Sequence, residues 1–392
     1  MAAKIVAIFN TKAKEFVKGR KNWKQQLIQS NIPNSPIWFH ISSLGEYEQA
    51  KPLLEELSNN HNLLITFYSP SGYTQKKKNA FTKHVFYLPI DTRSNAINFV
   101  RIVKPKLAVF IKYDLWPNYL NALHSCKIPT TLISAVFRPD HHYFKWYGMF
   151  FLRALKGINT ICVQDQKSAY VLQQNGINQV SVCGDTRIDA VLSDTKTVKL
   201  DKDLKKAYQH KKVLILGSSY QREETLTKQL IDDGLWTENL IIAPHQINEA
   251  RIEFIENLFG NDAIRFSVWN KVVAPKVLII DNIGMLRQLY AISNIAFIGG
   301  GFGKSIHNTL EPAALGLPIL FGPNYEMFAE ANWFVNSESA KCINDYADLK
   351  SFFTEINEET IEKMGNNNLN YLEKHQGASQ RSLSRFYALL GE

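Results

Sequence analysis

The sequence predicts an α/β protein with two domains, each built on a parallel β-sheet, that face a central cleft. Short apolar runs alternate with helix-like segments along most of the chain, which is typical of parallel βαβ units. The 392 residues also exceed the size of one typical core. A polar, lysine-rich stretch at residues 193–211 interrupts the alternation and is predicted to link domains 1–192 and 212–392.

Six apolar runs in the first domain are predicted to be strands. They lie at residues 37–41, 63–68, 84–89, 107–111, 130–134 and 160–164. Helices are expected at 47–57 and 96–103, between consecutive strands. In open parallel sheets, ligands bind at the carboxyl ends of the strands, so the turns that follow these runs are the places to look for a site.

The second domain repeats the same alternation. Its predicted strands lie at residues 213–216, 240–243, 277–280, 295–298 and 318–321. The tail after Leu349 is predicted to be helical and polar.

A glycine-rich turn follows the predicted strand at 295–298. Gly299, Gly300, Gly301 and Gly303 are followed by Lys304, and backbone N–H groups in such a turn can approach an anion closely. An ordinary βα turn is the alternative.

A short helix follows this turn and ends at Gly316, and its start has two interpretations. Asn308 and Glu311 have the spacing of a capping box. The favoured alternative places Glu311 at the cap and Pro312 at the first helical position, because a proline deeper in the helix would lose a hydrogen bond.

Composition excludes several classes of protein. Hydrophobic residues make up 45% and charged residues 21%, as in globular rather than disordered chains. The four cysteines have no CxxC spacing, which argues against a disulfide framework or a cysteine-bound metal. No run of about 18 apolar residues and no signal peptide is evident.

The chain carries a net charge of +9, which favours anionic partners. Seven cations and one acid lie between Lys4 and Lys24, interleaved with apolar residues. This pattern is typical of a basic amphipathic segment on an anionic membrane surface, and a solvated helix packed on the domain is the alternative.

Six short motifs occur in one order along the chain. They are Ser43-Leu44-Gly45-Glu46, DLWPN at 114–118, GDTRID at 184–189, GSS at 217–219, NIGML at 282–286 and HNTLEP at 307–312. In this order they resemble the 3-deoxy-D-manno-octulosonic acid (Kdo) transferases of lipopolysaccharide synthesis, over about residues 16–333.

The resemblance implies a GT-B fold, in which an amino-terminal Rossmann-like domain binds the acceptor and a carboxy-terminal one binds the nucleotide sugar. It further implies CMP-Kdo as donor, a lipid A precursor as acceptor, inversion at the anomeric centre, and a peripheral position at the cytoplasmic face of the inner membrane. Neither a metal nor a further cofactor is expected.

Glu46 matches the family's catalytic glutamate and is expected in a loop between strand and helix, where it would deprotonate the acceptor hydroxyl. Considered alone, a glutamate early in a helix more often only stabilises the helix dipole. On the acceptor side, Asp114 stands where the family has a glutamate. Arg138 is a candidate for a lipid phosphate, with a surface arginine as the alternative, and Trp116 and Pro117 have structural or binding roles.

The donor-binding positions carried over from the family fall in three places, with two small turn residues added. They are Pro244 and His245, then Ile283, Gly284 and Met285, then Asn308, Thr309, Leu310 and Glu311, and lastly Ser218 and Ser219. His245 replaces an arginine and Met285 a glutamate of the family pattern, whereas Asn308 and Glu311 are kept.

Two other functions remain open at this point. The same fold would serve another nucleotide-sugar transferase or a UDP-sugar epimerase. The alternative from a different functional class is a basic protein that binds nucleic acid, although the sequence has no RNP, KH or zinc pattern.

Overall fold

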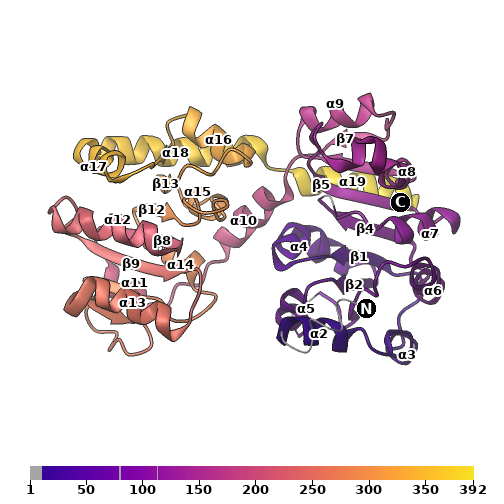
Figure 1. The fold of residues 1–392 in the computed structure, drawn as a ribbon, viewed down its shortest axis with the longest axis horizontal. Coiled ribbons are helices and arrows are strands. Elements are labelled where there is room, and N and C mark those ends of the chain that lie inside the picture. Colours follow the sequence, from indigo (N-terminus) through magenta and orange to yellow (C-terminus); the bar gives the residue numbers. More distant parts are fainter. Residues whose placement is uncertain (1–10, 79–80, 113) are drawn as a thin grey trace. The chain divides into compact units, whose positions relative to one another are not determined.

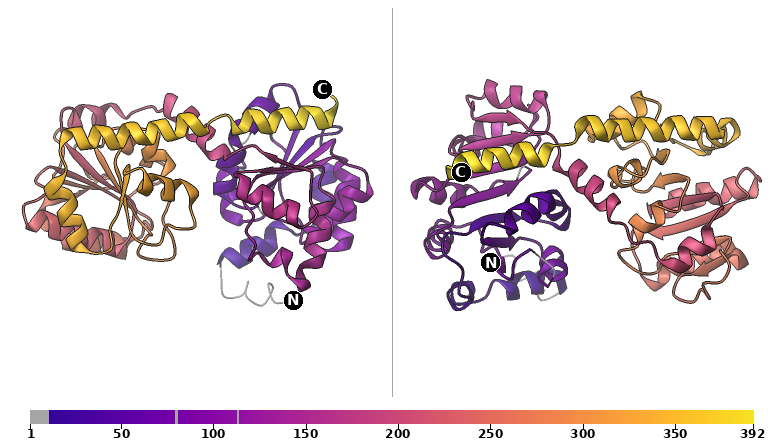
Figure 2. Two further views of the ribbon diagram at one scale, coloured as in Figure 1. Left: turned by 90° about the horizontal axis from the view of Figure 1, so that it is seen from above. Right: turned by 180° about the vertical axis from the view of Figure 1, so that it is seen from behind.

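The computed structural model describes residues 11–78, 81–112 and 114–392. The chain divides into two compact units, one of residues 1–190 with 375–392 and one of residues 191–374. Each unit holds a seven-stranded sheet whose strands are all parallel. Helices lie on both faces of each sheet (Figures 1 and 2). The prediction of an α/β protein with two parallel sheets is confirmed.

The first unit has the strand order β3-β2-β1-β4-β5-β6-β7. Its strands are β1 Ile37–Ile41, β2 Leu63–Phe67, β3 Val85–Tyr87, β4 Leu107–Ile111, β5 Thr130–Ala135, β6 Thr160–Val163 and β7 Val180–Val182. Its helices are α2 Thr11–Gly19, α3 Trp23–Gln29, α4 Leu44–Ser58, α5 Pro70–Lys76, α6 Arg93–Val103, α7 Pro117–Ser125, α8 Met149–Lys156, α9 Gln166–Gln174 and α19 Ala378–Leu390, with the 3₁₀ turns η1 His142–Phe144 and η2 Trp146–Gly148.

The second unit has the order β10-β11-β9-β8-β12-β13-β14. Its strands are β8 Val213–Ser219, β9 Asn239–Pro244, β10 Ala263–Arg265, β11 Val277–Ile279, β12 Ile295–Ile298, β13 Ile319–Phe321 and β14 Ala340–Cys342. Its helices are α11 Lys202–Tyr208, α12 Gln221–Asp232, α13 Glu249–Phe259, α14 Leu286–Tyr290, α15 Leu310–Ala313, α16 Ala329–Asn336, α17 Tyr346–Glu355 and α18 Glu358–His375, with the 3₁₀ turn η3 Gly260–Asp262. Helix α10, Thr186–Lys196, spans the boundary of the two units.

The central strands are buried on both faces, as expected for a parallel sheet covered by helices. Every residue of β1, β2 and β4 is buried, and so is every residue of β9 and β12. These continuous apolar runs hold the strand ends in fixed positions, so the loops that follow them are supported by a rigid core.

Two parts of the predicted domain division differ from the structure. Residues 193–211 are largely helical, because they contain the end of α10 and the whole of α11. The last helix, α19, belongs to the first unit rather than to the second, as the division at 212–392 would have it. Its apolar residues Leu383 and Phe386 are buried against the first sheet, and Phe386 lies beside Phe39.

The start of α19 is held by Asp189 at the end of the GDTRID motif. The Asp189 carboxylate accepts hydrogen bonds from the N–H groups of Gly377, at 2.6 Å, and Ser379, at 2.5 Å. Arg381 on the same helix donates to the Cys183 carbonyl at 2.7 Å. Asp189 therefore caps a helix that lies almost 190 positions away in the sequence.

Replacement of Asp189 by alanine removes this cap and leaves two N–H groups without their acceptor. We expect about 1 kcal/mol of local destabilisation, seen as faster amide hydrogen exchange over residues 378–390. Asp262→Ala, at an exposed position of η3, serves as the matched control. Equal exchange rates in wild type and Asp189→Ala would contradict the capping role.

Candidate functional site

Glu46 lies in the first turn of α4, directly after the buried strand β1. Ser43 is the N-cap of this helix, and Ser43 and Glu46 form a reciprocal capping box. The prediction that Glu46 sits in a loop before the helix is therefore wrong, because the cap allows the helix to begin at Leu44. Glu46 can therefore both cap α4 and act in the site.

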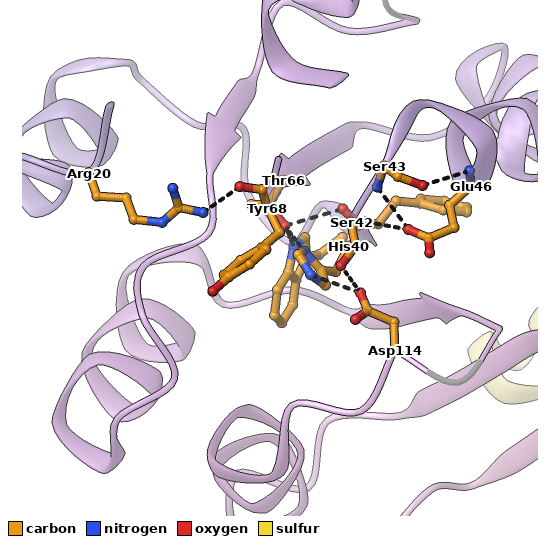
Figure 3. A network of polar contacts seen from close by, with 10 residues as sticks. Arg20, His40, Ser42, Ser43, Glu46, Thr66, Tyr68 and Asp114 are labelled. Carbon is orange, nitrogen blue, oxygen red and sulfur yellow. Dashed lines mark hydrogen bonds and ion pairs between the residues drawn. The ribbon is translucent and has the colours of Figure 1, made fainter. Parts of the chain in front are cut away.

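One oxygen of the Glu46 carboxylate is fixed by the backbone. Oε2 accepts hydrogen bonds from the N–H groups of Ser42, at 2.6 Å, and Ser43, at 2.9 Å (Figure 3). Within the described part of the chain, Oε1 accepts no hydrogen bond, and the side chain is partly exposed. The carboxylate is thus oriented through one oxygen and can offer the other to a ligand.

Asp114 follows the end of β4, the strand next to β1, and approaches the same place. Ser42 connects the two carboxylates, because its N–H donates to Glu46 and its hydroxyl donates to Asp114 (Figure 3). The parallel pairing of β1 and β4 explains this meeting of residues 72 positions apart, since both strands end at one edge of the sheet.

His40 is a further member of the site that the sequence analysis did not identify. It is fully buried in β1, and its Nε2 lies 3.2 Å from Asp114 Oδ2 (Figure 3). A histidine inside an apolar strand gives little sign of function, but alternation along the strand places His40 on the same face as Ser42.

Two polar side chains of the core, Trp38 and Thr66, lie on the Nδ1 side of His40. Trp38 Nε1 donates to Thr66 Oγ1 at 2.8 Å, and Thr66 Oγ1 lies 2.9 Å from His40 Nδ1. An indole N–H can only donate, so Thr66 Oγ1 accepts from Trp38, and the Phe39 carbonyl oxygen, 3.5 Å away, is a second acceptor for the Thr66 hydroxyl beside Nδ1. His40 is thus placed with Nδ1 beside Thr66 and Nε2 facing Asp114.

The two carboxyls have pKa values shifted in opposite directions. Burial raises the pKa of Glu46, and the negative charge of Asp114 raises it further. Burial also opposes ionisation of Asp114, but the contacts with His40 and Ser42 outweigh it and lower the pKa of this carboxyl. One carboxyl is thus kept charged while the other is made more basic, as acid–base sites require.

The other predicted acceptor-side residues lie differently. Arg138 follows β5, is half exposed and contacts Asp140 at 3.5 Å; no contact found in the described ranges joins it to Glu46 or Asp114. Trp116 packs edge-on against His40, with ring centroids 5.4 Å apart, and against Tyr68 at 4.6 Å. The Trp116 ring therefore packs beside the Asp114–His40 contact.

The glycine-rich turn of the second unit follows β12 as predicted and is tightly packed. A Cβ on Gly299 would lie 2.1 Å from the Ser218 carbonyl oxygen, and Gly300 has a φ of +94°. Both positions therefore require glycine. Glu223 in the first turn of α12 accepts the Gly300 N–H at 2.8 Å, which fixes the turn against that helix.

A cavity of 660 Å³ opens beside this turn, within the second unit. It is lined by residues from the end of β8, the start of α12 and the glycine-rich turn, among them Ser219, Arg222, Lys304 and His307. Of the residues that the structure describes, none forms an ion pair with Arg222 or Lys304. These cations suit a phosphate-bearing ligand.

Three rings are stacked at the mouth of the cavity. His245 and His307 lie 4.4 Å apart, Tyr220 lies against both, and the Tyr220 hydroxyl is 3.2 Å from His307 Nε2. Burial and the neighbouring His245 lower the pKa of His307 to about 4, so this ring is neutral at physiological pH. The sequence identified His245 but not the ring partners, which come from separate loops.

Helix α15 starts at neither of the two predicted positions. It begins at Leu310 after Thr309, and Asn308 Oδ1 accepts the Leu310 N–H at 3.1 Å. Pro312 is the third helical residue, where it costs no hydrogen bond because the first four N–H groups of a helix have no intrahelical partner. Glu311 is therefore not the N-cap.

The predicted donor-binding residues differ in exposure. The side chains of Pro244, Met285, Thr309, Leu310 and Ser219 are buried, and Ser219 donates to Glu224 at 2.7 Å. Among the predicted residues, Ser219 lines the cavity, whereas the exposed His245, Ile283, Gly284 and Asn308 and the partly exposed Ser218 and Glu311 are not among its lining residues.

Glu311 is oriented by a residue that the sequence analysis did not name. Arg287 in α14 lies 3.6 Å from the Glu311 carboxylate and 2.9 Å from that of Asp194. The arginine thus connects the carboxylate of the HNTLEP motif to helix α14 and to Asp194 of α10.

The absence of a metal remains a prediction. No group of three or more His, Cys, Asp or Glu residues in the described ranges is arranged to hold one. Within those ranges, no helix has the length and apolar character needed to cross a bilayer. Residues 4–10 of the predicted basic amino-terminal segment lie outside the described residues.

Comparisons with known proteins place these observations in a family context. Residues 20–190 match the family model described as "3-Deoxy-D-manno-octulosonic-acid transferase (kdotransferase)". The 3-deoxy-D-manno-octulosonic acid transferase of Haemophilus influenzae is 28% identical over 90% of this chain and 86% of its own length. That of Aquifex aeolicus is 26% identical over 78% of this chain and 80% of its own length. The chain is therefore related to these transferases over most of its length, as the motifs indicated.

Solved structures establish the fold independently. The UDP-GlcNAc 2-epimerase from Neisseria meningitidis bound to UDP-GlcNAc superposes with a TM-score of 0.66, at 18% identity, over 90% of this chain and 99% of that one. Another UDP-N-acetylglucosamine 2-epimerase gives a TM-score of 0.64 at 16% identity. At such low identity the likeness shows a shared GT-B-type fold and does not identify the reaction.

The influence of Asp114 on Glu46 can be tested by titration. In Asp114→Asn the negative charge is removed, so the pKa of Glu46 should fall relative to that in the wild type. Carbon-13 NMR of the glutamate carboxyl, assigned with Glu46→Gln, measures this directly. Asp140→Asn, an exposed carboxyl paired with Arg138, is the control. An unchanged Glu46 pKa in Asp114→Asn would show that the two carboxyls are not coupled.

Proposed function

We propose that this relative of the Kdo transferases is an inverting glycosyltransferase that moves Kdo from CMP-Kdo to a lipid A precursor in lipopolysaccharide synthesis. The family match covers the unit that contains Glu46, and the relatives that carry the transferase name cover most of the chain. The observation that carries the mechanism is the environment of the Glu46 carboxylate.

Glu46 is the proposed general base. An inverting transfer requires a group that takes the proton of the acceptor hydroxyl while the nucleotide leaves from the opposite face of the sugar. Two backbone N–H groups fix Oε2, and Oε1 has no donor in the described part of the chain. The raised pKa makes the carboxylate a stronger base than an ordinary glutamate.

Asp114 and His40 support this base without taking the proton themselves. Asp114 stays ionised because His40 and Ser42 stabilise its charge, and that charge raises the affinity of Glu46 for a proton. The Asp114 carboxylate also stands at the end of β4, where it can accept a hydrogen bond from the acceptor sugar.

The cavity of the second unit is the proposed donor site. Arg222 and Lys304, which line the cavity, supply positive charge for the CMP phosphate. Glu311, held by Arg287, is proposed to accept hydrogen bonds from the ribose hydroxyls. Neutral His307 and its partner His245 offer hydrogen bonds in place of the arginine of the family pattern.

We propose that no metal takes part in the transfer. In this scheme Arg222 and Lys304 stabilise the charge that develops on the leaving phosphate. The acceptor is a lipid, so we also propose that the protein works as a peripheral protein at the cytoplasmic face of a Gram-negative inner membrane, with the basic amino-terminal segment among its contacts.

The base is tested most cleanly with Glu46→Gln. Glutamine still accepts the Ser42 and Ser43 N–H groups and keeps the capping box, but it cannot take a proton. Transfer of Kdo to a tetraacylated lipid A precursor, with CMP-Kdo generated in situ, should fall about 100-fold or more. Thermal stability at pH 7.5 should be equal or higher, because the ionised form of a carboxyl with a raised pKa is disfavoured in the folded state.

Glu46→Ala separates the two roles of this residue. It should lose the same activity and, in addition, about 1 kcal/mol of stability from the broken capping box. Full activity in Glu46→Gln would leave Glu46 with the capping role alone. A wild type without transfer activity and without CMP binding would reject the proposed function.

The donor site is tested by nucleotide binding. Lys304→Ala should weaken CMP binding about tenfold, because an ionic hydrogen bond to the phosphate is lost. Lys341→Ala, an exposed lysine on β14, is the control and should bind CMP like the wild type. Calorimetric titration with CMP and with UMP measures the effect and the base preference; tighter binding of UMP would contradict the assigned donor.

A further inference from the structure

An unusual group of large apolar side chains is exposed on the first unit between β5 and β6. Trp146, Tyr147, Met149 and Phe150, here called the aromatic ridge, are 87%, 62%, 71% and 51% exposed. Single exposed apolar residues are common, but here four lie within five consecutive positions, and exposed apolar patches usually mark an interaction.

The ridge is a built feature rather than a loose loop. Phe144, Lys145 and Gly148 donate backbone hydrogen bonds to the carbonyls of His141, His142 and Lys145, which closes two consecutive turns. A Cβ at Gly148 would lie 2.0 Å from the His142 carbonyl oxygen, so the turns are tightly packed. The fold therefore holds the backbone of the aromatic ridge in place.

Buried aromatic residues anchor these turns to the core. Tyr143 is 7% exposed and lies against Phe137 and Phe151, with centroid distances of 6.3 and 5.6 Å. Because Tyr143 and Phe137 are buried, Trp146 and Tyr147 are exposed while the turn that carries them is packed on the core.

Helix α8 continues the ridge with positive charge. At about 100° per residue, Met149, Arg153 and Lys156 lie on one side of the helix and Phe150 lies next to them. All four are exposed, whereas Ala154 and Leu155 on the opposite side are buried. The helix thus presents an apolar first turn and a basic last turn.

The segment that carries the ridge has charges of one sign, and Asp140, directly before it, is paired with Arg138. Residues 141–157 contain Lys145, Arg153 and Lys156 and neither aspartate nor glutamate. Tryptophan and tyrosine are enriched where a protein meets the boundary between lipid headgroups and acyl chains, and neighbouring lysine and arginine side chains reach anionic headgroups. The exposed aromatic residues and the neighbouring cations therefore both match the surface of an anionic bilayer.

We propose that the aromatic ridge is a docking surface for an anionic lipid bilayer. Trp146, Tyr147, Met149 and Phe150 would enter the headgroup region, while Lys145, Arg153 and Lys156 contact lipid phosphates. This contact is separate in sequence from the basic amino-terminal segment. The inference rests on the proposed function in one respect, because it names the surface through which an enzyme with a lipid acceptor reaches its substrate.

The experiment measures co-sedimentation with vesicles of 70% phosphatidylcholine and 30% phosphatidylglycerol, without any substrate. Trp146→Ser/Phe150→Ser should lower the partition coefficient about tenfold or more, because two large side chains no longer enter the interface. The control is Val272→Ser/Val273→Ser, which changes two exposed apolar residues of the second unit and should bind like the wild type. Lys145→Gln/Arg153→Gln should reduce the dependence of binding on salt.

Transfer to a detergent-dispersed acceptor separates this inference from the proposed function. Trp146→Ser/Phe150→Ser should remain active there, which also shows that the variant is folded. Equal vesicle binding by wild type and this variant would overturn the docking surface, whatever the enzyme does. A variant that binds vesicles normally but no longer self-associates in solution would assign the ridge to a protein interface and overturn the proposal in the same way.

Discussion

The contact that Ser42 makes with two carboxylates is the interaction on which the site depends. Its N–H donates to Glu46 and its hydroxyl donates to Asp114, so a single residue sets the distance between a carboxyl of raised pKa and one of lowered pKa. The arrangement is possible because β1 and β4 are neighbouring parallel strands with buried, rigid ends. The pairing of β1 with β4 therefore places the two carboxyls of the acid–base site next to Ser42.

The interior of the fold was predictable, and its edges were not. Central strands such as β1, β4 and β12 are continuous apolar runs, because helices cover both faces of the sheet. The strands that the sequence analysis missed, β7, β10 and β14, are three-residue edge strands with partly exposed side chains. Such segments carry too little apolar signal to be distinguished from loops. The docking of α19 on the first unit depends on tertiary contacts of Asp189, which no local pattern announces.

The candidate site was predictable only in part, for similar reasons. Glu46, Asp114 and Glu311 stand in motifs that a family resemblance can locate, and the structure shows their surroundings. His40, His307 and Arg287 act through contacts between separate elements, so their roles follow from the assembled sheet and loops and not from spacing. The start of α15 was mispredicted because a proline early in a helix was treated as a proline in its interior.

The central claim is that Glu46 is the base of the transfer. The most direct test is the pH dependence of single-turnover Kdo transfer by the wild type and Glu46→Gln. The account predicts an acid limb in the wild type at a pH above the ordinary range of a glutamate, because the carboxyl must be ionised and its pKa is raised. That limb should vanish in the residual activity of Glu46→Gln. An acid limb that persists unchanged in Glu46→Gln would contradict the account, since another group would then be the base.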